Sequence, residues 1–248
     1  MRISNLMAGA LAVLALSAAP AAAQGRWRVA YPPAENPEYA ALQQHFAEQD
    51  ILSSMVGPLN EHFPVSRDVT VELAECGSEG AFYDAERPAV QLCYELLVNL
   101  AQSLMGGGEE GAEQVFAGAF AFILLHQVGH ALVDQLDLPV TVPPEQAADQ
   151  LTAVLTAFAP EELQTIAEGA LVLGERGVDW ENPGSGRAAL GGPRMQNLLC
   201  LFYGIDPEGY AWMVDEGHLP AARAEGCTDE IETVKEEWVE YLTPHTQG

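Results

Sequence analysis

The sequence AEQVFAGAFAFILLHQVGHALVDQL, from Ala112 to Leu136, decides the fold of this 248-residue chain. Its apolar residues fall on nearly every side of a helical projection, which predicts a helix that is buried on most of its circumference. His126 and His130 lie within this helix, and residues four apart share one helix face. The segment therefore predicts the centre of the fold and, at the same place, a pair of imidazoles that can face a common point.

The chain before this helix predicts one or two amphipathic helices followed by a small group of strands. Apolar residues recur at helical intervals between Pro37 and His62. Strands are expected where apolar and polar residues alternate, or where short apolar runs flank a turn. These strands are Val69–Leu73, Ala81–Tyr83 and Ala89–Cys93. Another helix is expected from Tyr94 to Met105.

The chain after the central helix is predicted to be helical, because prolines recur where helices would begin and proline is tolerated in the first turn. One helix is expected at 143–158 and a second begins at 160. After a loop at about 177–193, three more are expected near 194–203, 207–216 and 220–242. No repeat or linker divides the chain, so residues 24–248 are expected to form a single domain. The predicted fold class is α+β, a mainly helical domain with a small, mostly antiparallel sheet.

The first 23 residues are typical of a cleavable secretory signal peptide. Arg2 precedes an apolar stretch from Leu6 to Leu16, and the small residues 21–23 predict cleavage after Ala23. The apolar stretch is shorter than the run of about 20 residues that a membrane helix needs. We therefore expect a periplasmic or secreted bacterial protein that has no membrane attachment after cleavage.

Acidic residues dominate the charge of the chain: 36 Asp and Glu oppose 10 Lys and Arg, for a formal net charge of −26. Such a surface repels nucleic acids and anionic lipids. An acidic solvated surface is favoured over an acidic docking patch as its explanation. The composition therefore excludes nucleic acid as a partner but does not identify one, and a peptide or protein ligand or substrate is compatible with it.

The four cysteines, Cys76, Cys93, Cys200 and Cys227, predict two disulfides, because their number is even and exported proteins meet an oxidising compartment. Three pairings are possible. We expect Cys76 with Cys93 and Cys200 with Cys227, since this pairing closes two local loops. A zinc site made of cysteines is the weaker alternative, because none of the four has the close C-x-x-C spacing of such sites.

A second pair of candidate ligands follows the histidines. Glu145 and Asp149 are also four residues apart on the next expected helix, so they share one face. Two histidines and one glutamate form the zinc-binding set of thermolysin-like enzymes. We expect one Zn²⁺ bound by His126, His130 and Glu145, with Asp149 accepting the free N–H of His126. Asp149 as the third ligand in place of Glu145 is the alternative.

Gln127 occupies the position at which the H-E-x-x-H motif of zinc hydrolases carries its general base. A carboxamide cannot accept that proton, and general acid–base assistance is typically worth about 10²- to 10⁴-fold in rate. Weak or absent hydrolysis is therefore expected. Glu95 is a candidate replacement for the base, and Tyr94 or Tyr203 is a candidate donor to a developing oxyanion. Each tyrosine is more readily explained as a core residue.

Three stretches of the chain resemble a family of exported bacterial proteins of otherwise unknown function, described as putative metallopeptidases with an H-E-x-x-H motif. These stretches are Asp68–Glu95, Leu124–Asp149 and Asn197–Gly204, within a likeness that covers nearly all of the mature chain. The resemblance implies a zincin-like fold, His126 and His130 as metal ligands, an acidic contribution from Glu145 or Asp149, and structural cysteines. The chain departs from the family pattern at Gln127.

Two functions are consistent with these features. The first is a zinc metallopeptidase-like protein of the gluzincin type, in which His126, His130 and Glu145 hold zinc, water fills the fourth position and hydrolysis is weak or absent. The alternative is a non-catalytic pseudoenzyme that uses a retained metal or the old substrate groove for binding or stability. A structural protein without metal ranks third.

Overall fold

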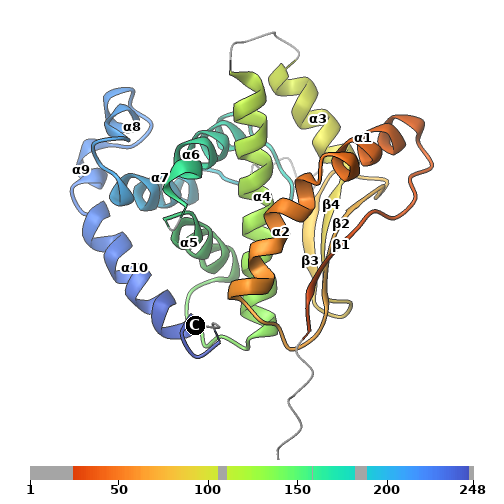
Figure 1. Cartoon of the computed structure of the whole chain (residues 1–248). Coiled ribbons are helices and arrows are strands. Elements are labelled where there is room, and N and C mark those ends of the chain that lie inside the picture. The colour runs from red at the N-terminus through yellow and green to blue at the C-terminus, as the bar shows by residue number, and fades with distance from the viewer. Residues whose placement is uncertain (1–24, 106–110, 158, 182–188, 246–248) are drawn as a thin grey trace, which may run out of the picture.

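The computed structural model describes residues 25–105, 111–157, 159–181 and 189–245, so the expected signal peptide, residues 1–23, lies outside the described residues. The first half contains β1 (Trp27–Ala30), α1 (Pro37–Glu48), α2 (Ile51–His62), β2 (Val69–Ala74), β3 (Ala81–Asp84), β4 (Ala89–Cys93) and α3 (Tyr94–Met105). The second half contains α4 (Ala112–Gln135), α5 (Pro144–Ala157), α6 (Pro160–Glu175), α7 (Pro193–Ile205), α8 (Ala211–Asp215), α9 (Ala221–Ala224) and α10 (Cys227–Leu242). Helix α4 runs through the centre, with the sheet on one side and the later helices on the other (Figure 1).

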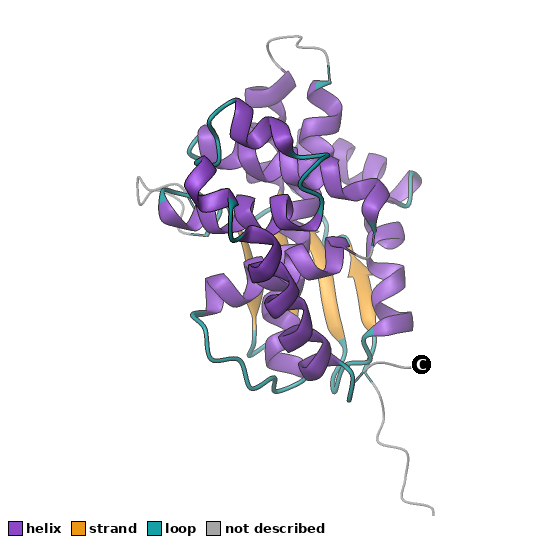
Figure 2. Ribbon diagram, turned by 90° about the vertical axis from the view of Figure 1, so that its left-hand side faces the viewer, coloured by secondary structure: helices purple, strands orange, loops and turns teal. Residues whose placement is uncertain are grey.

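The four strands of the described chain form one sheet in the order β1-β2-β4-β3. The β1–β2 and β2–β4 pairs are parallel, and the β3–β4 pair is antiparallel. The prediction of a mainly helical α+β fold is confirmed, but the sheet is mixed rather than mostly antiparallel. The expected strands did not include β1, and α1 and α2 provide the long crossover that parallel neighbours β1 and β2 need. Figure 2 shows the strands side by side behind the C-terminal helices.

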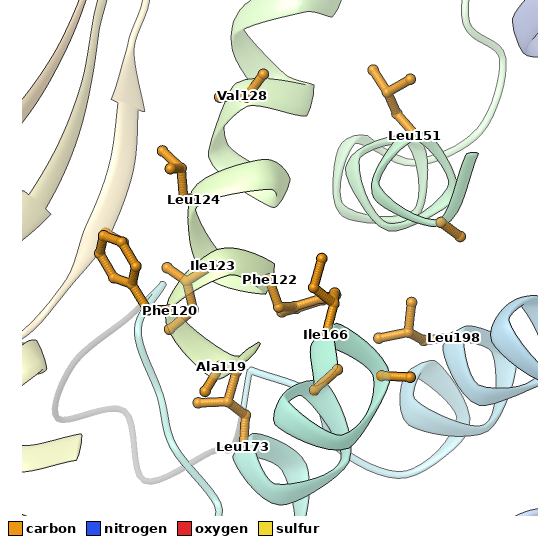
Figure 3. Close-up of a cluster of buried hydrophobic side chains, with 14 of the residues drawn as sticks. Ala119, Phe120, Phe122, Ile123, Leu124, Val128, Leu151, Ile166, Leu173 and Leu198 are labelled. Carbon is orange, nitrogen blue, oxygen red and sulfur yellow. The ribbon is translucent and has the colours of Figure 1, made fainter. Parts of the chain in front are cut away.

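Helix α4 is buried as its composition predicts, because it packs against α3, α5, α6 and two strands. Figure 3 shows Phe122 of α4, Leu151 of α5 and Ile166 of α6 in one apolar cluster. The closest packing is with α6, where a Cβ atom on Gly118 would overlap the backbone of Thr165. These contacts hold α4 in a fixed position and so fix the two histidines that it carries.

The length and composition of α4 would also suit a membrane-spanning helix, since an 18-residue window within Ala112–Gln135 has a mean hydropathy of 1.6. In the folded chain, 67% of that window is buried inside the protein. A core helix surrounded by other elements has the same composition. The packing therefore explains the hydropathy of α4 without a bilayer.

The structure contains the two expected disulfides, Cys76–Cys93 and Cys200–Cys227. The first joins the segment after β2 to the end of β4, and the second joins α7 to the start of α10. Disulfides persist in oxidising compartments, so both bonds agree with an extracellular or periplasmic protein.

Candidate metal centre

The two histidines and Glu145 bring three donor atoms together between α4 and α5. Nε2 of His126 lies 3.2 Å from Nε2 of His130 and 3.1 Å from Oε2 of Glu145. The third side of this triangle, from His130 Nε2 to Glu145 Oε2, is 3.5 Å. His126 is fully buried, whereas the side chains of His130 and Glu145 are 20% and 44% exposed. The triangle therefore opens toward solvent on the side of Glu145.

The dimensions of this triangle suit a metal ion. Zinc–nitrogen and zinc–oxygen bonds of about 2.0–2.1 Å in a tetrahedral site place the ligand atoms about 3.3–3.4 Å apart. The three observed separations, 3.1, 3.2 and 3.5 Å, lie around that value. Two imidazoles and a carboxylate also match the donor chemistry of known zinc sites. His126, His130 and Glu145 thus form a possible metal site.

The local sequence explains how α5 comes close to α4. Helix α4 ends where Asp137 adopts a left-handed conformation with φ of 49°, and the chain returns through a short segment to α5. At the crossing, a Cβ atom on Gly129 would lie 3.1 Å from Cα of Ala148, which is closer than ordinary carbon contacts. The absence of a side chain at Gly129 therefore lets α5 approach the ligand face of α4.

Asp149 lies one turn after Glu145 and faces the other nitrogen of His126. Its Oδ1 is 3.0 Å from His126 Nδ1, although the ring N–H is not directed at this oxygen. The side chain of Asp149 is only 6% exposed. Its position beside the ring agrees with the expected orienting role.

Arg194, which the sequence did not single out, is the cation of the site. Its Nε and Nη2 donate to the two carboxylate oxygens of Asp149 at 2.6 and 2.9 Å, and Nη1 donates to Oε1 of Glu181 at 2.7 Å. Arg194 occupies the first turn of α7, where the helix dipole disfavours a positive charge. The chain has only 10 basic residues. One of them at an unfavourable helix start therefore indicates that carboxylates lie nearby.

Glu181 is the second residue that the sequence did not predict. It follows α6, and its Oε1 lies 3.5 Å from Nε2 of His126. The pKa of Glu181 is raised to about 7, and burial is the largest cause. The neighbouring Glu145 carboxyl group also raises this pKa, whereas Arg194 lowers it. Glu181 therefore places another carboxylate at the edge of the candidate metal site.

The charged groups of the site shift one another's pKa. Burial lowers the pKa of His126, but the carboxylates of Asp149 and Glu145 raise it above its usual value. Burial raises the pKa of Glu145, and contacts with both histidines overcome this, so its pKa falls well below the usual range. The pKa of Asp149 is also lowered, because Arg194 and His126 outweigh its burial. Glu145 and Asp149 are therefore held as carboxylates, the form that suits a cation.

The other residues that the sequence singled out do not supply a general base or an oxyanion donor to the candidate metal site. Gln127 is buried on α4 with 2% exposure, directly after His126. Glu95, the candidate replacement base, instead accepts backbone N–H bonds from Cys76 and Gly77. Tyr94 is fully buried, and its ring stacks on Tyr39 with centroids 5.7 Å apart. Glu95 therefore does not serve as the replacement base, and the further carboxylate beside the histidines, besides Glu145 and Asp149, is that of Glu181.

A small cleft of about 250 Å³ adjoins the site, and Glu145, Asp149 and Arg194 form part of its wall. The other residues of its wall are Pro143, Gln146, Gln150, Asn197, Leu198, Leu201 and Glu230. The wall combines charged and amide side chains with apolar surface from residues such as Leu198 and Leu201, as ligand pockets commonly do.

Comparison with known proteins places the chain in a described family. A family model described as "putative metallopeptidase" matches residues 31–242. Neither the curated proteins nor the solved structures contain a match to the chain. The matched region includes α4, α5 and all of the residues of the candidate metal site. The chain therefore belongs to this family of putative metallopeptidases.

Proposed function

We propose that the protein binds one Zn²⁺ through His126, His130 and Glu145 and is a metallopeptidase homologue with weak or no hydrolytic activity. The observation that carries the proposal is the triangle of three donor atoms with sides of 3.1, 3.2 and 3.5 Å. Membership of the metallopeptidase family supports the same type of site.

The residues around the site have separable roles in this proposal. A zinc ion held there would polarise a carbonyl group and activate water. Asp149 orients the buried ring of His126, and Arg194 fixes Asp149 through two charged hydrogen bonds. Gln127 cannot act as a general base, and the loss of that assistance costs about 10²- to 10⁴-fold in rate. The site thus retains its ligands without the group that removes a proton.

We also propose that the protein acts outside the cytoplasm as a single domain, residues 24–248, after removal of residues 1–23. The two disulfides and the composition of the N-terminal segment support this. A peptide or protein is the proposed ligand, because the family is described as putative metallopeptidases. The net charge of −26 disfavours nucleic acid and anionic membranes. A non-catalytic binding role remains the second candidate, and Gln127 is the observation that favours it.

Metal analysis tests the first part of the proposal. The purified protein is expected to contain close to one zinc per chain by elemental analysis, and His126→Ala is expected to abolish binding. His62→Ala is a matched control, because His62 is exposed at the end of α2. Wild-type protein that binds no zinc when the metal is supplied in excess would contradict the proposal.

A cleavage assay tests the second part. Wild type and Gln127→Glu are incubated with a broad peptide library at saturating zinc. Wild type is expected to show little or no cleavage. If wild type cleaves at rates typical of metallopeptidases and Gln127→Glu adds nothing, the role assigned to Gln127 is wrong.

A further inference from the structure

A groove of about 1060 Å³ lies on a different face of α4 from the candidate metal site. Its wall includes Ala117, Ala121 and Leu125, which are four residues apart and therefore share one face of the helix. His126 directly follows Leu125, and successive residues of a helix point about 100° apart. His126 and His130 thus face away from the groove, which is a separate surface of the protein.

The groove is mainly apolar, and its size is at the upper end of the range for ligand pockets, about 300–1,000 Å³. Helix α2 shows that its apolar residues are additional to the core. Leu52, Val56 and Leu59 form the buried face of α2. Ile51 and Met55 lie on another face, are only half-buried and line the groove. Helix α2 therefore presents apolar side chains to a space that the described chain does not fill.

The backbone around the groove favours a helical ligand over an extended one. Nearly all of the residues that line the groove lie inside helices α1 to α6. The N–H and C=O groups of a helix interior pair with one another, so the described wall offers no strand edge to which an extended peptide could add. An amphipathic helix pairs its own backbone groups and lays its apolar face into a groove of this kind.

The charged residues of the groove favour a basic ligand. Glu38 of α1 and Glu162 of α6 are exposed and line the groove. Helices α1 and α6 lie on opposite sides of α4 (Figure 1). Among the described residues, neither glutamate forms an ion pair, and the wall contains no lysine or arginine. The other polar side chains of the wall are His45, Ser54, Gln102 and Thr156.

From these observations we infer that the groove binds an amphipathic, basic helix of a partner protein. Lysine or arginine at the two edges of such a helix would meet Glu38 and Glu162, while its apolar face fills the groove. A fatty acid would instead place its carboxylate near these glutamates. A second copy of the chain would bring a further net charge of −26 to the same acidic rim. The inference goes beyond the proposed function and does not depend on bound zinc.

A synthetic helical peptide of about 14 residues, or four turns, provides the first test. One face of the peptide is made of leucine and the other of lysine, and a control peptide has glutamate in place of every lysine. Binding to the purified protein is measured by the fluorescence anisotropy of the labelled peptide. The lysine peptide is expected to bind, and the glutamate peptide at least about 10-fold more weakly, because like charges would then face each other.

Met55→Glu distinguishes binding in the groove from a general attraction to an acidic protein. The added negative charge would strengthen a general attraction to the lysine peptide. Binding in the groove is instead expected to weaken by at least about 10-fold, because the charge is placed in an apolar contact. Ser53→Glu is the matched control, since Ser53 is exposed on α2 outside the described wall of the groove. Circular dichroism and zinc affinity check that both variants fold.

Replacing Glu38 and Glu162 together by glutamine tests the charges without disturbing the core, because both residues are exposed. Affinity for the lysine peptide at low salt is expected to fall by about 2- to 30-fold, the range for the loss of two exposed ion pairs. The control replaces Glu61 and Glu86 by glutamine, since both are exposed outside the described wall. It changes the net charge equally and should leave the affinity unchanged.

Four results would overturn the inference: no binding of the lysine peptide, equal affinity for the two peptides, undiminished binding in Met55→Glu, or equal affinities in the two double variants. Oleic acid that displaces the lysine peptide would assign the groove to a lipid and so contradict the inference. A dimer that Met55→Glu dissociates would assign it to a second copy, with the same consequence. His126→Ala should leave peptide binding intact, so the groove and the proposed metal site are tested independently.

Discussion

Gly129 controls the distance between the two helices that carry the candidate ligands, and Gly129→Ala tests its role. A Cβ atom at this position would lie 3.1 Å from Cα and 3.3 Å from both Cβ and O of Ala148. Carbon atoms pack best at about 3.5–4.0 Å, so α5 must move away from α4 by a few tenths of an ångström. Metal–ligand distances tolerate changes of only about 0.2 Å. The substitution therefore separates Glu145 from His126 and His130 by more than a metal site allows.

We expect Gly129→Ala to weaken zinc binding by about 10- to 100-fold, as when a ligand loses its correct support. Overpacking of this kind is also expected to lower the free energy of unfolding by about 1–3 kcal/mol. Affinity is measured by competition with a chelator, and stability by denaturant unfolding of the metal-free protein.

Gly57→Ala is the control for this experiment, because Gly57 lies inside α2 and a Cβ atom there would meet nothing within 4 Å. It should leave zinc affinity unchanged and stabilise α2 by about 0.5–1 kcal/mol, since alanine favours a helix interior over glycine. Zinc affinity in Gly129→Ala equal to that of wild type would refute the argument that this contact sets the ligand distances.

Three further predictions concern the surroundings of the site. Gly169→Ala should lower stability by at least about 1–3 kcal/mol in thermal or denaturant unfolding, because its Cβ would overlap the backbone of α4 at Ala119. Arg194→Gln should destabilise the metal-free protein by about 3–5 kcal/mol, since it removes the partner of the buried Asp149 carboxylate. Saturating zinc should reduce this loss of stability. An equal loss with and without zinc would contradict the prediction. Replacing Cys200 and Cys227 together by serine should lower the free energy of unfolding by about 2–4 kcal/mol, measured under oxidising conditions, because their disulfide closes a loop with a sequence separation of 27.

The sequence predicted those parts of the fold and site that depend on regular spacing. The four-residue interval places His126 and His130 on one face of α4, and the same interval places Glu145 and Asp149 on one face of α5. Both helices exist, and their ligand faces meet. Periodicity was sufficient here because each pair of residues lies within a single helix.

The parts that could not be predicted depend on contacts between distant segments. β1 has only four residues, so its alternation is too short to distinguish a strand from a loop, and its parallel pairing with β2 needs the whole α1–α2 crossover. Glu181 lies in a segment without periodicity, and its approach to His126 depends on the packing of α6 against α4. No spacing rule connects positions 55 residues apart. Arg194 left only an indirect signal, its unfavourable place at the start of a helix.

The position of Arg194 has a consequence for how the protein would acquire its metal. The guanidinium counters part of the negative charge, and it bridges Asp149 and Glu181 through contacts that involve no metal ion. The donor atoms are thus preorganised, and uptake need not be coupled to the folding of a disordered chain, as it is in zinc fingers. Calorimetric titration with zinc should accordingly give a heat-capacity change close to zero, because little apolar surface leaves water when a ready-made site is filled.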